Sequence, residues 1–175
     1  MFDKATSHER KPAPGKARAP RKKPAPGKTS AQQLAGFLVK FEPPVAATAR
    51  AALSKLRKRV PGALELVYDN YNALAIGFSP SEKPSEGIFS IAIYPRWVSL
   101  FFLQGAKLPD PDRVLSGTGN QVRHIVLTET AVLDKPAVRK LMALALRSAK
   151  KPLDPKQRRR LIIKSVSAKQ RPRRP

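Results

Sequence analysis

The side chains that most often carry out catalysis are scarce in this chain. It has no cysteine, so thiolate nucleophiles, thiolate metal sites and disulfides are excluded. His8 lies in a basic N-terminal stretch, and His124 has no second histidine or paired carboxylate near it. No serine-hydrolase, zinc-protease or dinucleotide-binding motif is present. We therefore expect a protein that is not an enzyme and needs no cofactor; the alternative is an unrecognised site around His124, Arg123 and Lys107.

A glycine-containing loop at 116–120 is the best candidate for binding a small anion. Successive backbone N–H groups in such a loop can contact an anion, and Lys107 and Arg123 would add positive charge. His124 and Trp97 complete this candidate ligand site. The alternative is that the glycines only form tight turns. The loop lacks the Gly-Lys-Ser/Thr ending of a P-loop, so we do not expect nucleotide hydrolysis.

Positive charge dominates the composition and is concentrated at the two ends. The formal net charge is +23. Residues 1–29 hold 9 Lys and Arg and 2 acids, residues 30–149 hold 15 and 9, and residues 150–175 hold 11 and 1. Charge of this kind favours nucleic-acid association, because phosphate contacts release counterions. The predicted nucleic-acid-binding residues are Lys22, Lys23, Arg158, Arg159, Arg160, Arg171, Arg173 and Arg174.

No helix-turn-helix, zinc-finger or RNA-recognition sequence accompanies this charge. We therefore expect non-specific association with DNA or RNA, without reading of the bases. Two alternatives stay open: the charge only keeps the protein soluble, or the 158–166 segment lies on a membrane surface.

Both ends are predicted to be disordered tails around one domain. Residues 1–29 are rich in Pro, Ala and Lys and have no large apolar residue between Lys4 and Thr29, so burial cannot offset the entropy of ordering. Near the other end, Leu161, Ile162 and Ile163 lie among arginines, and we expect this segment to fray. The predicted organisation is a basic tail at 1–29, a domain at 30–149 and a basic tail at 150–175.

Residues 30–149 predict an α+β domain. Apolar residues recur at helical spacing within 44–59 and 134–149, a short helix begins near Ser30, and Asp134 is the expected N-cap of the last helix. Strand-like runs lie at 63–69, 73–79, 88–94, 97–103 and 122–127. The expected architecture is an antiparallel sheet of about five strands, with two or three helices on one face.

The hairpin across Pro95-Arg96 is the clearest strand pairing. A two-residue turn would place Ile93 opposite Val98 and build one large apolar face. The other face carries small residues with rings around them: Ser90, Ala92, Ser99, Tyr94, Trp97 and Phe101. We interpret this smooth face as a docking surface for a protein or a small ligand. Coverage by a second copy or by a tail, or simple exposure, are the alternatives.

Segment 101–125 contains two turn motifs in a fixed order. The first, GA-x-L-x-DP, is formed by Gly105, Ala106, Leu108, Asp110 and Pro111. The second, LxGxGxxxR, is formed by Leu115, Gly117, Gly119 and Arg123. Their lengths and order resemble the YdhG-like family, which is catalogued as a domain of unknown function. The resemblance extends from about residue 60 to residue 149.

The resemblance implies a frataxin-like α+β sandwich. Some members of the family are described as intracellular iron chaperones for iron–sulfur cluster assembly, so iron delivery is the alternative function. Frataxin-type iron binding uses a ridge of carboxylates, and Glu65 and Asp69 are the acids that this chain offers there. Helix 44–59 is basic instead, and its positive potential opposes a bound cation.

The chain has no apolar run near the roughly 20 residues that span a bilayer. Its N-terminus also lacks the apolar stretch of a secretory signal. We therefore expect a cytoplasmic protein without a membrane span, associated with the nucleoid through its tails.

Overall fold

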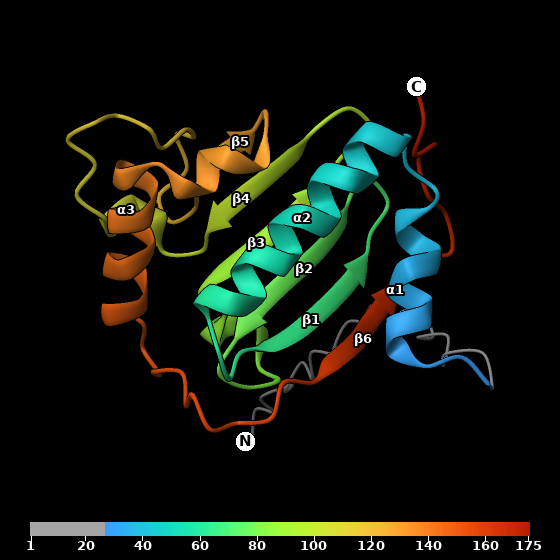
Figure 1. The fold of residues 1–175 in the computed structure, drawn as a ribbon, viewed down its shortest axis with the longest axis horizontal. Helices are drawn as coiled ribbons and strands as arrows, with labels where there is room; N and C mark the ends of the chain where they lie inside the picture. Colours follow the sequence, from blue (N-terminus) through green and yellow to red (C-terminus); the bar gives the residue numbers. More distant parts are fainter. Residues whose placement is uncertain (1–26) are drawn as a thin grey trace, which may run out of the picture.

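A six-stranded open sheet is the centre of the fold (Figure 1). The computed structural model describes residues 27–175. The strands lie in the order β5-β4-β3-β2-β1-β6, and all neighbours are antiparallel except β1 and β6. Their bounds are Leu64–Asp69 for β1, Leu74–Ser79 for β2, Phe89–Ile93 for β3, Val98–Phe102 for β4, Arg123–Leu127 for β5 and Leu161–Val166 for β6.

Three helices pack on one face of this sheet. They are α1 (Ser30–Leu38), α2 (Pro43–Arg59) and α3 (Pro136–Arg147). In Figure 1, α2 runs across the sheet, α1 lies beside β6 and α3 lies at the opposite side. A proline occupies the first turn of α2 and of α3, where no helical N–H bond is lost. The predicted α+β class, with an antiparallel sheet and helices on one face, is confirmed.

The predicted hairpin register is also correct. Ile93 pairs with Val98, and Phe89 pairs with Phe102, whose ring it meets edge to face at a centroid distance of 5.5 Å. These side chains and those of Ile76 on β2 are fully buried beneath the helices. Side chains alternate between the two faces of a strand, so the register that buries these residues turns their small neighbours to the other face.

The last helix starts differently from the prediction. A 3-10 turn, η3 (Thr130–Asp134), precedes α3, and no side chain caps the helix. The prediction of Asp134 as the N-cap is therefore wrong. Its carboxylate instead pairs with Lys55 and Arg59 on α2, and so it joins the two helical elements.

The C-terminal segment is a strand of the sheet and not a disordered tail. β6 pairs with β1 in parallel, and its flanking residues extend the pairing: the Ser167 N–H donates to the Asp69 carbonyl at 2.8 Å, and the Arg171 N–H donates to the Tyr71 carbonyl at 2.9 Å. Leu161 and Ile163 pack against the core. The prediction of a frayed segment is wrong because β1 offers an unpaired edge to this apolar run.

The chain reaches β6 through residues 148–160, which pass close to the end of α2. At Gly62, whose φ is +80°, an added Cβ would lie 1.8 Å from the Asp154 carbonyl oxygen. The Gln157 side chain donates to the Gly62 carbonyl at 2.6 Å. A glycine at this position therefore lets the connection pass.

The predicted N-terminal tail, 1–29, lies outside the described residues except for its last three. Of those, Thr29 caps α1 together with Gln32. None of the helices within residues 27–175 has the length and apolar character needed to cross a bilayer.

Candidate functional site

Two buried acids on β1 hold the C-terminal segment in place. Glu65 accepts hydrogen bonds from the Arg57 guanidinium at 2.9 and 2.7 Å, and Arg159 lies 3.5 Å away. The Asp69 carboxylate lies 2.7 Å from Arg173 and 3.3 Å from Lys40. Both carboxylates are almost fully buried. Two cations therefore lie beside each buried carboxylate, and their attraction offsets the free energy that it costs to remove the charge from water.

Glu65 and Asp69 are also the acids that the iron alternative assigned as metal ligands. Hard cations favour several clustered oxygen ligands. Here each carboxylate already contacts a guanidinium, and no group of three His, Cys, Asp or Glu within residues 27–175 is placed to hold a metal ion. The geometry gives these two acids a role in docking the C-terminal segment.

Arg173 is the central residue of this docking. Its side chain is only 3% exposed. Besides Asp69, it binds the Tyr71 carbonyl at 3.4 Å and lies over the Phe41 ring, 5.4 Å from the centroid. A phosphate group cannot reach this guanidinium, so the predicted nucleic-acid-binding role does not fit Arg173.

The other predicted C-terminal arginines divide into two kinds. Three are held by acids of the folded part: Arg159 by Glu65, Arg160 by Glu82 at 3.1 Å and Arg174 by Glu42 at 3.9 Å. Arg158 and Arg171 are exposed and form no ion pair within residues 27–175. Lys22 and Lys23 lie outside the described residues.

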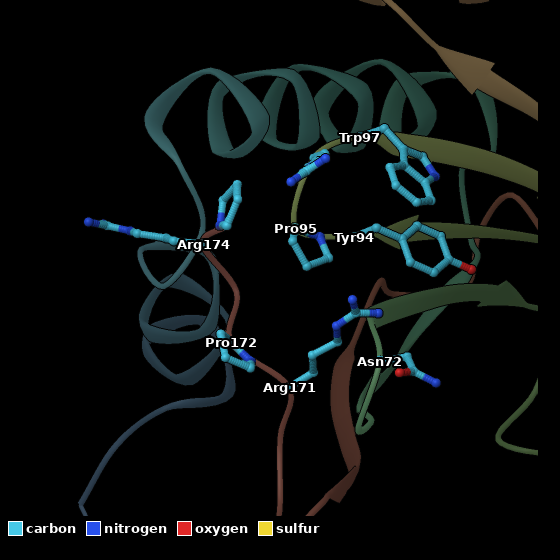
Figure 2. A pocket seen from close by; sticks show the side chains of 9 residues that line it. Asn72, Tyr94, Pro95, Trp97, Arg171, Pro172 and Arg174 are labelled. Carbon is cyan, nitrogen blue, oxygen red and sulfur yellow. The ribbon is translucent and has the colours of Figure 1, made fainter.

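A pocket of about 640 Å³ forms where the C-terminal end meets the turn between β3 and β4 (Figure 2). Its volume is in the range of small-molecule sites. The side chains that give it chemical character are two aromatic rings, one amide and three guanidinium groups, from Tyr94, Trp97, Asn72, Arg96, Arg171 and Arg174.

The two rings come from the residues that flank the Pro95-Arg96 turn. The Tyr94 N–H donates to the Trp97 carbonyl at 2.9 Å, so both side chains project from the same face of the hairpin. Their rings stack with a centroid distance of 4.9 Å and an interplanar angle of 22°. Trp97 remains 45% exposed. The stack therefore presents an accessible indole at the pocket.

The charged side chains that line the pocket are all arginines. No Asp or Glu lines it. Figure 2 shows the Arg171 side chain extending toward Asn72 and Tyr94, whereas Arg174 points away from the other labelled side chains. Arg174 donates to the Val39 carbonyl at 3.1 Å and is near Glu42. Arg171 and Arg96 have no such partner within residues 27–175. The available cations of the pocket are therefore Arg171 and Arg96.

The structure brings the predicted anion site together only in part: Arg123 and His124 lie beside the 116–120 loop, where Ser116 pairs with His124, but Trp97 lies elsewhere. Trp97 precedes β4, whereas Arg123 pairs with Phe102 at the other end of that strand. The Arg123 guanidinium donates to the carbonyls of Val122 and Gly119, and His124 stacks on Phe101 at 5.2 Å. Lys107 is exposed in a short 3-10 turn beside α3. Of the four predicted residues, only Trp97 lines the basic pocket.

A second hollow, of about 500 Å³, lies on the sheet face opposite the helices. It shares Asn72 and Tyr94 with the basic pocket. Small side chains form its floor and aromatic rings its borders; they include Ala75, Ser90, Ala92, Tyr71 and Phe101. The two hollows together follow the face that the sequence pattern marked as smooth.

Sequence reasoning missed the partners of Trp97 in the pocket. Arg171 and Asn72 are about a hundred residues apart and meet only because β6 pairs with β1. The local signal that was available is the pair of aromatic residues, Tyr94 and Trp97, on either side of a two-residue turn. No protein-family model, curated protein or solved structure matches this chain.

Proposed function

We propose that this domain binds nucleic acid through its phosphates, without sequence specificity. The observation that carries the proposal is a surplus of cations on the folded part. Residues 27–175 hold 27 Lys and Arg and 10 Asp and Glu. Of the 27 cations, 11 form ion pairs and the other 16 have no carboxylate partner within these residues. Unpaired cations of this number favour a polyanion.

The unpaired cations are spread over several exposed surfaces. They include Arg50 and Lys58 on α2, Arg139 and Arg147 on α3, and Arg158 in the connection to β6. A distribution of this kind suits contacts to a phosphate backbone, which position a nucleic acid but carry no sequence information. It supports non-specific association with DNA or RNA in the cytoplasm, including the nucleoid, as part of the same proposal.

In this proposal most of the binding charge lies on the folded domain, whereas the sequence predicted that it lies in two disordered tails. Two disordered arms were expected to bind, but β6 and Arg173 are part of the fold. The folded surface and the remaining free arginines take over that role at the C-terminal end. Residues 1–26, which hold 8 Lys and Arg including Lys22 and Lys23, would add charge at the other end.

Salt dependence of binding tests this function. The affinity of the full chain for a labelled oligonucleotide would be measured by fluorescence anisotropy at several salt concentrations. If about six cations contact phosphates, a plot of log affinity against log salt falls with a slope of roughly −5. An affinity that does not change with salt contradicts the proposal.

Iron delivery by a YdhG-like, frataxin-like domain is the alternative that the turn motifs imply, and it stays a prediction. We favour nucleic acid because Glu65 and Asp69 are both bound to cations of the chain itself. An iron ion would have to displace Arg57 or Arg173 before it could use either carboxylate.

A further inference from the structure

We propose that the basic pocket binds single-stranded nucleic acid, with a base stacked on the Trp97 indole and the adjoining phosphate held by Arg171 and Arg96. This inference rests on the proposed function and specifies its ligand and its site. Sequence-independent binding of single strands typically combines two elements, aromatic side chains on which bases stack and cations that follow the backbone. The pocket contains both.

The contact between Tyr94 and Trp97 in the hairpin does not by itself account for the exposure of the indole. A stacked Tyr94–Trp97 pair stabilises the turn, but this role does not require an indole that is 45% exposed. Tryptophan gains most from burial, so leaving its surface in water costs free energy that a stacked ligand would recover. A base has a flat π face that matches this exposed ring.

The cations of the pocket are Arg171, whose backbone is held in place, and Arg96. The backbone N–H of Arg171 is tied to the Tyr71 carbonyl at 2.9 Å, and the next residue but one is the buried Arg173. The Arg171 side chain therefore reaches the pocket from a segment whose backbone is held beside β1. Neither it nor Arg96 has an ion-pair partner within residues 27–175. Arginine binds phosphate with two parallel N–H donors, so these groups suit the backbone of a nucleic acid.

The second hollow extends the proposed site, so that it can hold more than one nucleotide of a single-stranded nucleic acid. It begins at the shared residues Asn72 and Tyr94 and continues across the sheet face to Phe101. Small residues between the rings leave room for bases to lie flat against the sheet. An amide such as that of Asn72 can donate to and accept from a base edge. A row of rings on an open antiparallel sheet is also a surface on which unpaired RNA bases stack in known modules.

A duplex does not fit this arrangement. Its bases are stacked on each other and paired, so they cannot reach the indole without being extruded, which costs a few kcal/mol. The geometry therefore favours unpaired bases over a double helix. The cations elsewhere on the surface would still hold a duplex, but without this contact.

Trp97 is the only tryptophan of the chain, so its fluorescence reports on the pocket directly. The full chain would be titrated at low salt with an oligothymidylate of about 12 nucleotides and with a duplex of the same length. We expect quenching of Trp97 by the single strand, and tighter binding of the single strand than of the duplex.

Two variants and one matched control complete the experiment. Trp97→Leu should lower the affinity for the single strand by at least about 5-fold. Arg171→Gln should lower it more than Arg139→Gln, which removes the same charge from the exposed surface of α3. The melting temperature of each variant would show whether it is folded. The wild-type fluorescence titration does not depend on any variant.

The outcomes separate this inference from the proposed function. Binding of both nucleic acids with equal affinity, with no quenching and with Trp97→Leu and Arg171→Gln no weaker than Arg139→Gln, overturns the pocket as the site but leaves non-specific binding intact. Absence of any binding at low salt overturns both.

Discussion

The Arg173 guanidinium lies 2.7 Å from the buried carboxylate of Asp69, and this contact joins residues 104 positions apart in the chain. It anchors the C-terminal end beside β1, and Arg171 reaches the pocket from that anchored segment. The strand pairing, the buried ion pair and the proposed ligand site are therefore connected. A change at Arg173 should affect the stability of the fold and the site together.

We predict that Arg173→Met strongly destabilises the protein. Loss of one partner of a buried ion pair costs about 3–5 kcal/mol, and we expect about 3 kcal/mol because Lys40 still lies 3.3 Å from Asp69. Thermal unfolding should show a fall in Tm of roughly 10 °C. The matched control is Arg174→Gln, at a half-exposed guanidinium near Glu42, which should cost at most about 1 kcal/mol. Equal Tm values for the two variants would show that the buried pair has no special weight.

Alanine at two glycines should have opposite effects. Gly62→Ala forces a side chain into positive φ and against the Asp154 carbonyl, so it should lower the stability by more than about 1 kcal/mol. Gly36 lies exposed in α1 with nothing near its Cβ position, so Gly36→Ala should raise the stability by roughly 0.5–1 kcal/mol. Urea unfolding of both variants checks this. A Gly62→Ala protein as stable as wild type would mean that residues 148–160 do not pass there.

The contact between Asp134 and α2 should be sensitive to acid. The Lys55 ammonium, hydrogen-bonded to the Asp134 carboxylate, holds the pKa of that carboxylate below its ordinary value of 3.8, and Arg59 adds to the effect. Because the pKa is lowered in the folded state, the ionised Asp134 carboxylate stabilises that state above pH 3.8. This stabilisation is lost as the pH falls through the lowered pKa. Asp134→Asn should therefore lower the Tm at neutral pH, and the difference from wild type should shrink below pH 3.8. A difference that grows in acid would contradict this.

Ferrous iron should not change the thermal stability of the protein. Because Glu65 and Asp69 are held by Arg57 and Arg173, we expect no rise in Tm when Fe²⁺ is added in excess under anaerobic conditions. The control is the same titration of Glu65→Gln. A rise in Tm for the wild type that is absent from this variant would favour the iron-delivery alternative.

The parts of the fold that were predictable are those with local signals. The β3–β4 register follows from alternating apolar residues around a two-residue turn, so Ile93 and Val98 could be paired from sequence alone. The stripe of α2 follows from its 3.6-residue spacing. Each of these signals comes from residues that are close together in the sequence, and tertiary contacts did not override it.

β6 could not be predicted because its stabilising partners are distant. Leu161, Ile162 and Ile163 are surrounded by arginines, and that composition is typical of disorder when it is considered locally. The charges are compensated by Glu65 and Glu82, about eighty or more residues earlier in the chain. The site shows the same limit: Trp97 could be singled out as an aromatic residue, but not its neighbour Arg171.

The most direct test of the account is to map where a single strand contacts the protein. The full chain would be crosslinked by ultraviolet light to an oligothymidylate at low salt, and the crosslinked peptides identified by mass spectrometry. We predict crosslinks on Trp97 and Tyr94, together with Tyr71 or Phe101 on the same sheet face. Crosslinks confined to residues 1–26 or to α3 would contradict the assignment of the pocket as the nucleic-acid site.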